Sequence, residues 1–288
     1  MSQAKIGVQA MMLKGKFDEL GAYETLKKVS ELGFRCIELS QIEMSAENVS
    51  EIKRACEDFN IEIAAISAGL EPSGKMPQET LTTHFDKIVE DCKTLNCSFI
   101  RIGMLPFQCM GSTEKVLEFC DKANEVAKKL AEHHIKLYYH NHHVEFQKYD
   151  GKYLLDIMKE KADQIGFELD VHWIQRGGLN PVDVIRAYSG KVDLLHLKDY
   201  RIGSLPESAF EALGKGDFTG FMNAFTNIVE FAEVGEGSLD MKGIIEEGLA
   251  CGVKYLLIEQ DNQYGKDPFD CLALSAQNLR KLGYEELF

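Results

Sequence analysis

Short runs of β-branched and aromatic residues alternate with longer amphipathic segments along almost all of this 288-residue chain. Eight runs have the length and composition of buried strands: Lys5–Ala10, Cys36–Ser40, Ile61–Ser67, Phe99–Gly103, Lys136–Asn141, Ile165–Asp170, Val192–Leu197 and Tyr255–Gln260. A β–α unit repeated eight times forms either an open doubly wound sheet or a closed barrel. No GxGxxG follows the first run, which removes the main support for a dinucleotide-binding open sheet. We therefore predict an α/β fold, a single (β/α)₈ TIM barrel over residues 1–288.

Amphipathic segments between the runs predict the helices of the barrel: Phe17–Leu32, Glu47–Phe59, Thr80–Leu95, Thr113–His134, Gly151–Ala162, Val182–Tyr188 and Met241–Ala250. One connection is longer than the others. Residues 198–254 form an extended excursion after the seventh run and contain a further helical pattern at Phe218–Ala232. Loops that follow barrel strands lie at the catalytic end of this fold. The excursion therefore forms a lid or rim, or else it is a structural insertion or an oligomerisation surface.

The composition of the chain limits the kinds of partner that it can bind. Thirty-two Lys and Arg against forty-six Asp and Glu give a net charge of −14, which repels phosphate backbones and anionic lipid surfaces. No local basic patch offsets this charge, so nucleic acid and membrane partners are disfavoured. The first residues lack a secretory signal pattern, and no apolar run approaches the ~20 residues of a membrane span. Eight cysteines without a CxxC pair indicate reduced thiols, and we expect a cytoplasmic protein.

Polar side chains break the apolar pattern where each of the last four runs ends. These residues are His140, His142 and Glu145 after the fifth run, Asp170 at the sixth, His196 and Lys198 at the seventh, and Glu259 and Asp261 at the eighth. Strands five to eight are neighbours in a barrel, so their carboxyl ends share one arc of its catalytic rim. Residues two apart on a strand share a face, so several of these side chains can point inward together.

Carboxylates crowded into a buried pocket repel one another unless a cation is held among them. We choose Glu145, Asp170, His196 and Glu259 as the ligands of one divalent metal ion, with His142 as the alternative to Glu145. Three carboxylates and one imidazole suit Mn²⁺ or Mg²⁺, and Co²⁺ or Zn²⁺ can compete. The absence of cysteine from this set argues against a structural zinc site.

Other polar residues are candidates for substrate contacts. Lys198 is a candidate catalytic or oxyanion-binding group, with an ion pair to Asp170 or Asp199 as the simpler interpretation. Trp173 and Arg176 are candidates for a pocket wall and an anion contact, although packing and a surface ion pair explain them equally well. Glu38 is a candidate substrate contact, and a structural pair with Arg101 is its alternative.

Five segments together resemble the xylose-isomerase-like TIM-barrel superfamily, and within it the sugar phosphate isomerase/epimerase group: Tyr139–Phe146, Glu168–Trp173, Leu194–Tyr200, Gly235–Asp240 and Leu257–Asp261. In such proteins Glu, Asp, His and Glu from four successive strand ends bind a divalent metal, often manganese. These roles fall on Glu145, Asp170, His196 and Glu259. The chain departs from ketose 3-epimerases, whose first metal-binding Glu stands in an ExxN pattern, because that position is Tyr138 here.

The resemblance implies a metal-dependent isomerase or epimerase that acts on a sugar or sugar phosphate by proton transfer through an enediolate. Glu145 and Glu259 would then also serve as acid/base groups, with His140 or His142 next, because a neutral imidazole titrates in the useful range. Mn²⁺ is the first choice of cofactor, and no nicotinamide is needed. The alternatives are a dehydratase or lyase acting on a keto-inositol or 3-keto-glycoside, an endonuclease-IV-like phosphodiesterase, and a non-catalytic sugar-binding subunit. Homo-oligomerisation stays open.

Overall fold

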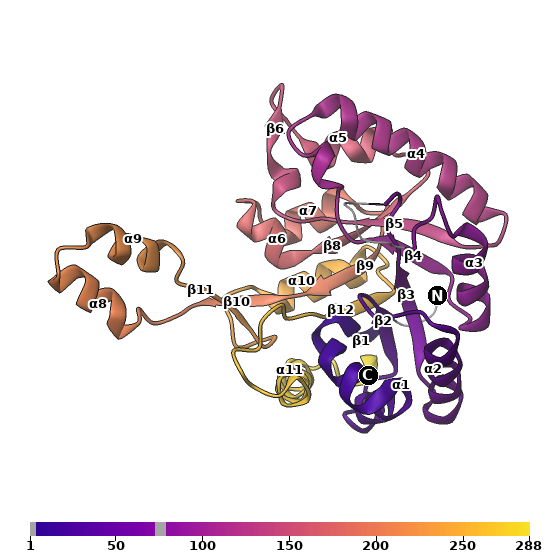
Figure 1. Cartoon of the computed structure of the whole chain (residues 1–288), viewed down its shortest axis with the longest axis horizontal. Coiled ribbons are helices and arrows are strands. Elements are labelled where there is room, and N and C mark those ends of the chain that lie inside the picture. The colour runs from indigo at the N-terminus through magenta and orange to yellow at the C-terminus, as the bar shows by residue number, and fades with distance from the viewer. Residues whose placement is uncertain (1–3, 73–78) are drawn as a thin grey trace.

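A computed structural model describes residues 4–72 and 79–288 and confirms the (β/α)₈ TIM barrel (Figure 1). Parallel strands close in the order β1-β12-β9-β8-β5-β4-β3-β2, and β1 completes the ring by pairing Lys5 with Tyr255 of β12. The barrel strands are β1 (Lys5–Gln9), β2 (Cys36–Leu39), β3 (Glu62–Ser67), β4 (Phe99–Ile102), β5 (Lys136–His140), β8 (Gly166–Asp170), β9 (Val192–Leu197) and β12 (Tyr255–Ile258). Each of these strands falls on one of the eight runs expected from the sequence.

Helices surround the barrel, and several of them begin where a polar side chain caps their free backbone N–H groups. Ser45 caps α2, Ser112 caps α4 and Asn180 caps α7, the last with Pro181 at the first helical position. The barrel helices are α1 (Lys14–Glu31), α2 (Ala46–Phe59), α3 (Phe85–Thr94), α4 (Thr113–Ala131), α5 (Leu154–Lys161), α6 (Val171–Arg176), α7 (Pro181–Ala187), α10 (Met241–Ala250) and α11 (Pro268–Lys281). Within the described residues, none of the helices has both the length and the apolarity to cross a membrane.

The predicted helix at Thr80–Leu95 is wrong at its start. The chain first makes a turn, in which Thr80 bridges to Gly69 and the hydroxyl groups of Thr80 and Thr83 lie 2.8 Å apart. These side-chain bonds compete with the helical backbone bonds, so the helix begins only at Phe85. The predicted helix at Gly151–Ala162 is also wrong at its start, because Lys152–Tyr153 form β7, which pairs with β6 (Lys148–Tyr149), and α5 begins at Leu154. The short helix α6 and α11 were not predicted.

An arm leaves the barrel after β9 and extends away from it (Figure 1). Its stem is an antiparallel ribbon of β10 (Asp199–Ile202) and β11 (Val229–Ala232), and its tip holds α8 (Glu207–Gly214) and α9 (Phe218–Thr226). The predicted helix at Phe218–Ala232 is therefore wrong in its second half. Its last four residues, Val229–Ala232, pair with β10 because β-branched and aromatic side chains suit a ribbon.

The barrel interior is layered because residues two apart on a strand share a face. The lower layer is apolar and includes Cys36, Phe99, Tyr138, Leu194 and Leu257. The residues two positions further along the same strands are polar and buried, and they are Glu38, Arg101, His140, His196 and Glu259. The strands therefore carry an apolar floor and a charged upper layer toward their carboxyl ends.

Candidate metal centre

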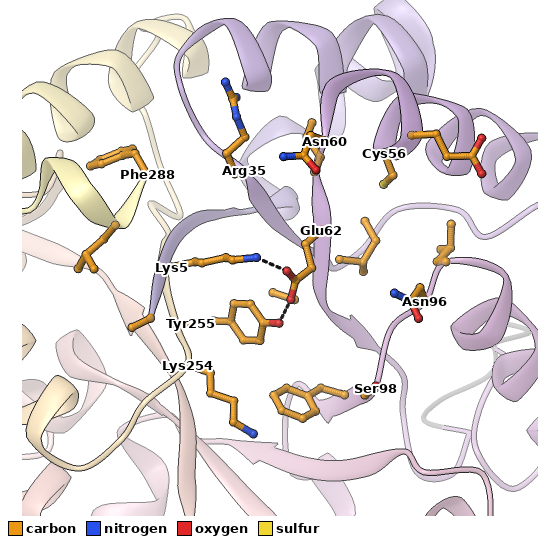
Figure 2. Close-up of a pocket in the computed structure, with 18 of the residues that line it drawn as sticks. Lys5, Arg35, Cys56, Asn60, Glu62, Asn96, Ser98, Lys254, Tyr255 and Phe288 are labelled. Atoms are coloured by element: carbon orange, nitrogen blue, oxygen red, sulfur yellow. Dashed lines mark hydrogen bonds and ion pairs between the residues drawn. The ribbon is translucent and has the colours of Figure 1, made fainter. Parts of the chain in front are cut away.

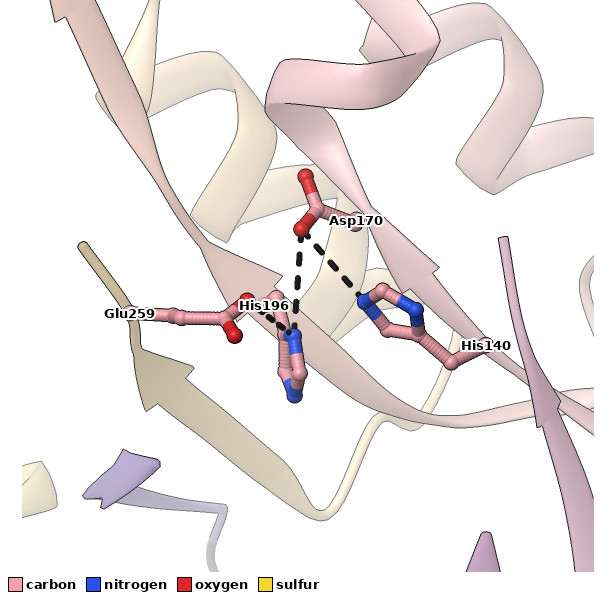
Figure 3. Close-up of side chains that lie close together, drawn as sticks. All are labelled: His140, Asp170, His196 and Glu259. Carbon is pink, nitrogen blue, oxygen red and sulfur yellow. Dashed lines mark ion pairs between the residues drawn. The ribbon is translucent and has the colours of Figure 1, made fainter. Parts of the chain in front are cut away.

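Four consecutive barrel strands bring two imidazoles and two carboxylates together at their carboxyl ends (Figure 3). His140 comes from β5, Asp170 from β8 and His196 from β9, while Glu259 directly follows β12. One nitrogen or oxygen from each residue lies within 4.8 Å of the others, and all four side chains are buried. His196 Nδ1 lies 2.8 Å from Glu259 Oε2 and 3.8 Å from Asp170 Oδ2. His140 Nε2 lies 3.4 Å from the same Asp170 oxygen.

In each carboxylate of this cluster, one oxygen accepts a hydrogen bond that fixes the orientation of the side chain. Asp170 Oδ1 accepts the backbone N–H of Trp173 at 3.0 Å and so caps α6. Glu259 Oε1 accepts a hydrogen bond of 2.9 Å from Gln9 Nε2, and Gln9 is itself fixed because its oxygen accepts the Met11 N–H. The second oxygens, Asp170 Oδ2 and Glu259 Oε2, remain directed toward the two histidines.

His196 connects this cluster to a second buried group. Its Nε2 atom lies 3.3 Å from Glu38 Oε2 and 3.2 Å from Glu168 Oε1, on the side opposite to Asp170 and Glu259. Carboxylates accept the N–H of an imidazole, so Glu38 and Glu168 hold a proton on Nε2, and a cation in the cluster would leave the ring in the tautomer protonated on Nε2 alone. In that tautomer the lone pair of His196 Nδ1 faces the cluster.

Arg101 forms ion pairs with the two glutamates below the cluster. Its Nε atom lies 2.7 Å from Glu38 Oε1 and 3.3 Å from Glu168 Oε2, and its Nη2 atom donates a hydrogen bond to the Ser40 hydroxyl. Glu38 therefore makes the ion pair with Arg101 that was the alternative to a substrate contact. The strand register shifts beside both glutamates, because β3 has one extra residue (Ala64) opposite Ile37/Glu38 and β9 has one (Asp193) opposite Phe167/Glu168.

Lys198 is buried beside the cluster and contacts three carboxylates. Its Nζ atom lies 3.0 Å from Asp170 Oδ2, 2.8 Å from Glu259 Oε2 and 2.9 Å from Asp261 Oδ1. Although burial lowers the pKa of this ammonium, the neighbouring carboxylates raise it far above its ordinary value. Of the two ion pairs expected from the sequence, Lys198 therefore makes the one with Asp170.

The imidazoles differ in protonation because their surroundings differ. Burial lowers the pKa of His140 to about 4 and that of His142 to about 3, so both rings are neutral near pH 7. Burial also disfavours the charged form of His196, but Glu168, Glu259 and Glu38 raise its pKa well above the usual value. A divalent cation in the cluster would take the place of the proton on the His196 nitrogen that it contacts.

The structure places Glu145 apart from the four clustered residues. Its carboxylate accepts the Tyr139 hydroxyl at 2.5 Å and the backbone N–H of His142 at 2.8 Å. Burial raises the pKa of this carboxyl group above its usual value. Among the described residues, His140 rather than Glu145 or His142 completes the group of four. The ring of His142 lies next to that of His140, with 4.9 Å between the ring centroids.

An aromatic wall flanks Lys198. The Trp173 ring lies 5.1 Å from Lys198 Nζ and packs against His142, His143 and His172. Phe231, from the stem of the arm, contacts both His172 and Trp173. Arg176 is exposed at the last turn of α6.

Sequence reasoning missed two residues that shape the centre. Glu168 stands two positions before Asp170 and therefore shares its face, a spacing that marks it as inward-pointing. Gln9 ends β1, whose other described residues are mostly apolar, and it orients Glu259 across the barrel seam. Gln9 could have been found from the sequence, because it is a polar residue at the end of an apolar run.

The donor set fits a divalent metal ion. Within the part of the chain that the structure describes, the buried His140 Nε2 and His196 Nδ1 atoms make no hydrogen bond. Asp170 Oδ2 and Glu259 Oε2 beside them have the Lys198 ammonium as their ion-pair partner. Buried polar atoms are rarely left unpaired, and imidazole with carboxylate is a common ligand set for transition metals. Lys198 shares the two carboxylate oxygens, but an oxygen with two lone pairs can serve an ammonium and a metal together.

A pocket of ≈ 940 Å³ opens at the opposite end of the barrel (Figure 2). At its centre the Glu62 carboxylate accepts hydrogen bonds from Lys5 and Tyr255, so its charge is compensated locally. Residues at this end of the barrel fold serve stability rather than chemistry.

The model of the xylose isomerase-like TIM barrel family matches residues 26–232, and the chain belongs to this family. Among curated proteins, none matches the chain. A sugar phosphate isomerase/epimerase from Parabacteroides distasonis is 19% identical with a TM-score of 0.74, covering 98% of this chain and 99% of that one.

Two further solved structures share the fold. A probable 3-DHS dehydratase from Bacillus anthracis is 17% identical with a TM-score of 0.69, covering 96% of this chain and 98% of its own. A 3-keto-D-glucoside 4-epimerase from E. coli is 15% identical with a TM-score of 0.63, covering 97% and 99%. At these identities the likeness establishes the fold alone.

Proposed function

We propose that this chain is a divalent-metal-dependent isomerase or epimerase acting on a sugar or sugar phosphate by proton transfer through an enediolate. The observation that supports this proposal is the buried cluster of His140, Asp170, His196 and Glu259 at the catalytic end of the barrel. The relatives of similar fold include an isomerase/epimerase and a keto-glucoside epimerase, which agrees with this choice.

The four clustered residues would hold the metal ion. With two imidazoles and two carboxylates, the set favours a transition metal such as Mn²⁺, Co²⁺ or Zn²⁺ over Mg²⁺, which prefers an all-oxygen shell. When bound, the metal supplies a Lewis acid that polarises a carbonyl group and stabilises negative charge on its oxygen.

The chain's own residues would bind the substrate and move the proton. Glu259 is held ionised because Lys198 and His196 lower its pKa despite its burial, so its carboxylate can accept a proton. Lys198 would donate a hydrogen bond to a substrate oxygen in exchange for its contact with Asp261, which is the most exposed of its three carboxylate partners. Trp173 would form the apolar wall against one face of the sugar ring.

A second candidate is a dehydratase or lyase acting on a keto-inositol or 3-keto-glycoside. The composition of the cluster favours it. Epimerisation is expected to use a second carboxylate as a base, but β5 supplies the neutral imidazole of His140 at that place. Elimination needs one base, for which Glu259 serves, and one acid to protonate the leaving hydroxyl. Lys198 is the neighbouring acid.

Incubation with Mn²⁺ in D₂O distinguishes these reactions. The substrates are ketoses, ketose phosphates, keto-inositols and 3-keto-glycosides, and NMR with mass spectrometry is the readout. An epimerase or isomerase introduces solvent deuterium next to the carbonyl without losing water. A dehydratase gives a product lighter by one water. Full turnover by a metal-stripped sample would contradict both versions.

The substitution Asp170→Asn tests the proposed metal centre, with Asp240→Asn as its matched control. Asn keeps the side-chain oxygen that caps α6 but lacks the negative charge, so turnover should fall by about 100-fold or more, as for loss of a catalytic-site electrostatic group. Asp240→Asn makes the same change at the cap of α10, where Asp240 accepts the Gly243 N–H at 3.0 Å, and should leave turnover unchanged. Equal activity of the two variants would exclude the proposed centre.

A further inference from the structure

The tip of the arm exposes an apolar surface that its own barrel does not cover. Among residues 203–227 only Ala209 is buried, although both helices carry large apolar side chains. Figure 1 shows α8 and α9 at the far end of the β10–β11 stem, away from the barrel. The exposed fractions are 55% for Phe210, 45% for Leu213, 62% for Phe218, 37% for Met222 and 53% for Phe225.

These side chains follow the period of a helix. Phe218, Met222 and Phe225 are spaced i, i+4 and i+7, which places them on one face of α9. Phe210 and Leu213 are spaced i, i+3 on α8. The tip is therefore a helical pair with an apolar stripe directed to solvent, as in a structure that lacks its partner.

Helices of this length are not stable by themselves. α8 has 8 residues and α9 has 9, whereas isolated helices shorter than ~12–15 residues are marginal in water. Within the tip, Phe221 contacts Phe210, Phe218 and Phe225, but this small cluster remains largely open to solvent. Further burial of the stripe would supply the missing stabilisation.

We propose that the tip packs against the tip of a second copy of this chain, so that the two helical pairs form a four-helix bundle around a twofold axis. Self-association suits this surface because it is apolar, which makes it complementary to itself. Two helical pairs with apolar faces commonly combine in this way. The stripe contains no charged residue, and on α8 Glu211 pairs with Lys215 at 3.6 Å, so two tips can meet without opposing unpaired charges on the contact face.

The area available matches a stable dimer. A fully buried aromatic side chain covers roughly 150–250 Å², so these half-exposed side chains offer about 500 Å² of apolar surface per copy. Two copies would bury about 1,000 Å² of apolar surface. Homodimer interfaces are about 65% apolar, so the total is about 1,500 Å², which falls within the standard range of about 1,200–2,000 Å².

The test is the mass of the full chain in solution, measured by light scattering after gel filtration from about 1 to 100 µM, since dimer formation depends on concentration. The wild-type chain should have twice the monomer mass of 32.4 kDa. The double substitution Phe218→Glu and Phe225→Glu should weaken the dimer by about 30-fold or more, as expected when hot-spot aromatic residues are lost. Phe107→Glu is the matched control, because Phe107 is 70% exposed on the barrel, and it should leave the dimer intact.

A second variant removes the tip altogether. Gly203 N–H already donates to Ile228 O at 2.8 Å, so residues 204–227 can be replaced by an Asn-Gly turn that closes the hairpin. This variant should be a folded monomer. A wild-type monomer at the highest concentration, a dimer that persists in both arm variants, or an open-ended polymer would each overturn the proposal.

Discussion

At the scale of single residues, the centre depends on which side chain β5 contributes. His140 ends the strand on the same face as Tyr138, so strand alternation directs it into the barrel. Glu145 lies five residues further on, in the short helical turn Val144–Phe146, and its carboxylate bonds back to Tyr139 and His142. A sequence pattern shows the polar residue but does not show that the turn folds its carboxylate away.

The substitutions His140→Gln and Glu145→Gln separate the two assignments. We expect His140→Gln to weaken metal binding by more than the roughly 10–100-fold that loss of an outer partner costs, because a ligand atom is lost. Glu145→Gln can keep the hydrogen bond from Tyr139 and should change the affinity by less than about 10-fold, below that range. Isothermal titration with Mn²⁺ and Zn²⁺ measures both. The reverse order of effects would return Glu145 to the ligand set.

Lys198 balances the carboxylates when no metal is bound. Lys198→Met leaves Asp170 and Glu259 without their buried ammonium, which should destabilise the metal-free protein by about 3–5 kcal/mol. The same change should increase the rise in melting temperature caused by added metal, because a competing positive charge is gone. Lys254→Met is the control, since Lys254 is 41% exposed in its pair with Asp193 and should cost about 0–1 kcal/mol. An unchanged response to metal in Lys198→Met would contradict this role.

At the scale of elements, the barrel strands were predictable, whereas of the arm only its place in the chain and the helix from Phe218 were. Buried parallel strands are continuous apolar runs, so all eight could be located from composition. The arm contains short helices and a two-stranded ribbon, and its apolar residues fit both the period of a helix and the period of a strand. Within the arm, the segment Phe218–Ala232 changes from helix to strand. Only the tertiary pairing with β10 decides that change, and no local pattern contains it.

The base of the arm is fixed by one buried carboxylate. Asp199 accepts backbone N–H groups from Tyr200, Gly235, Gly237 and Leu239 at 2.9–3.2 Å. A Cβ atom at Gly237 would lie 2.1 Å from the Asp199 carboxylate oxygen, which explains the glycine at this position.

Gly237→Ala should therefore lower the free energy of unfolding by about 1–3 kcal/mol, the usual cost of overpacking. Gly15→Ala is the matched control, because a Cβ there meets nothing within 4 Å and α1 is helical at that point. It should be neutral or stabilising by about 0.5–1 kcal/mol. Urea unfolding compares the two, and equal stabilities would show that Asp199 does not restrain the loop.

At the scale of the whole molecule, the centre joins four strands and so couples metal binding to the stability of the barrel. A ligand that binds only the folded state at 100 times its dissociation constant adds about 2.7 kcal/mol. For a chain of this size, each kcal/mol raises the melting temperature by roughly 2–4 °C. We expect chelation to lower the melting temperature by at least about 5 °C. Unchanged melting curves with and without chelator would show that the cluster does not bind metal.

The most direct measurement is anomalous X-ray diffraction from crystals grown with Mn²⁺ or Zn²⁺, recorded at the absorption edge of each metal. The account predicts one anomalous peak per chain at the carboxyl ends of β5, β8, β9 and β12, in contact with His140, Asp170, His196 and Glu259. No peak at saturating metal, or a peak coordinated by Glu145 in place of His140, would contradict it.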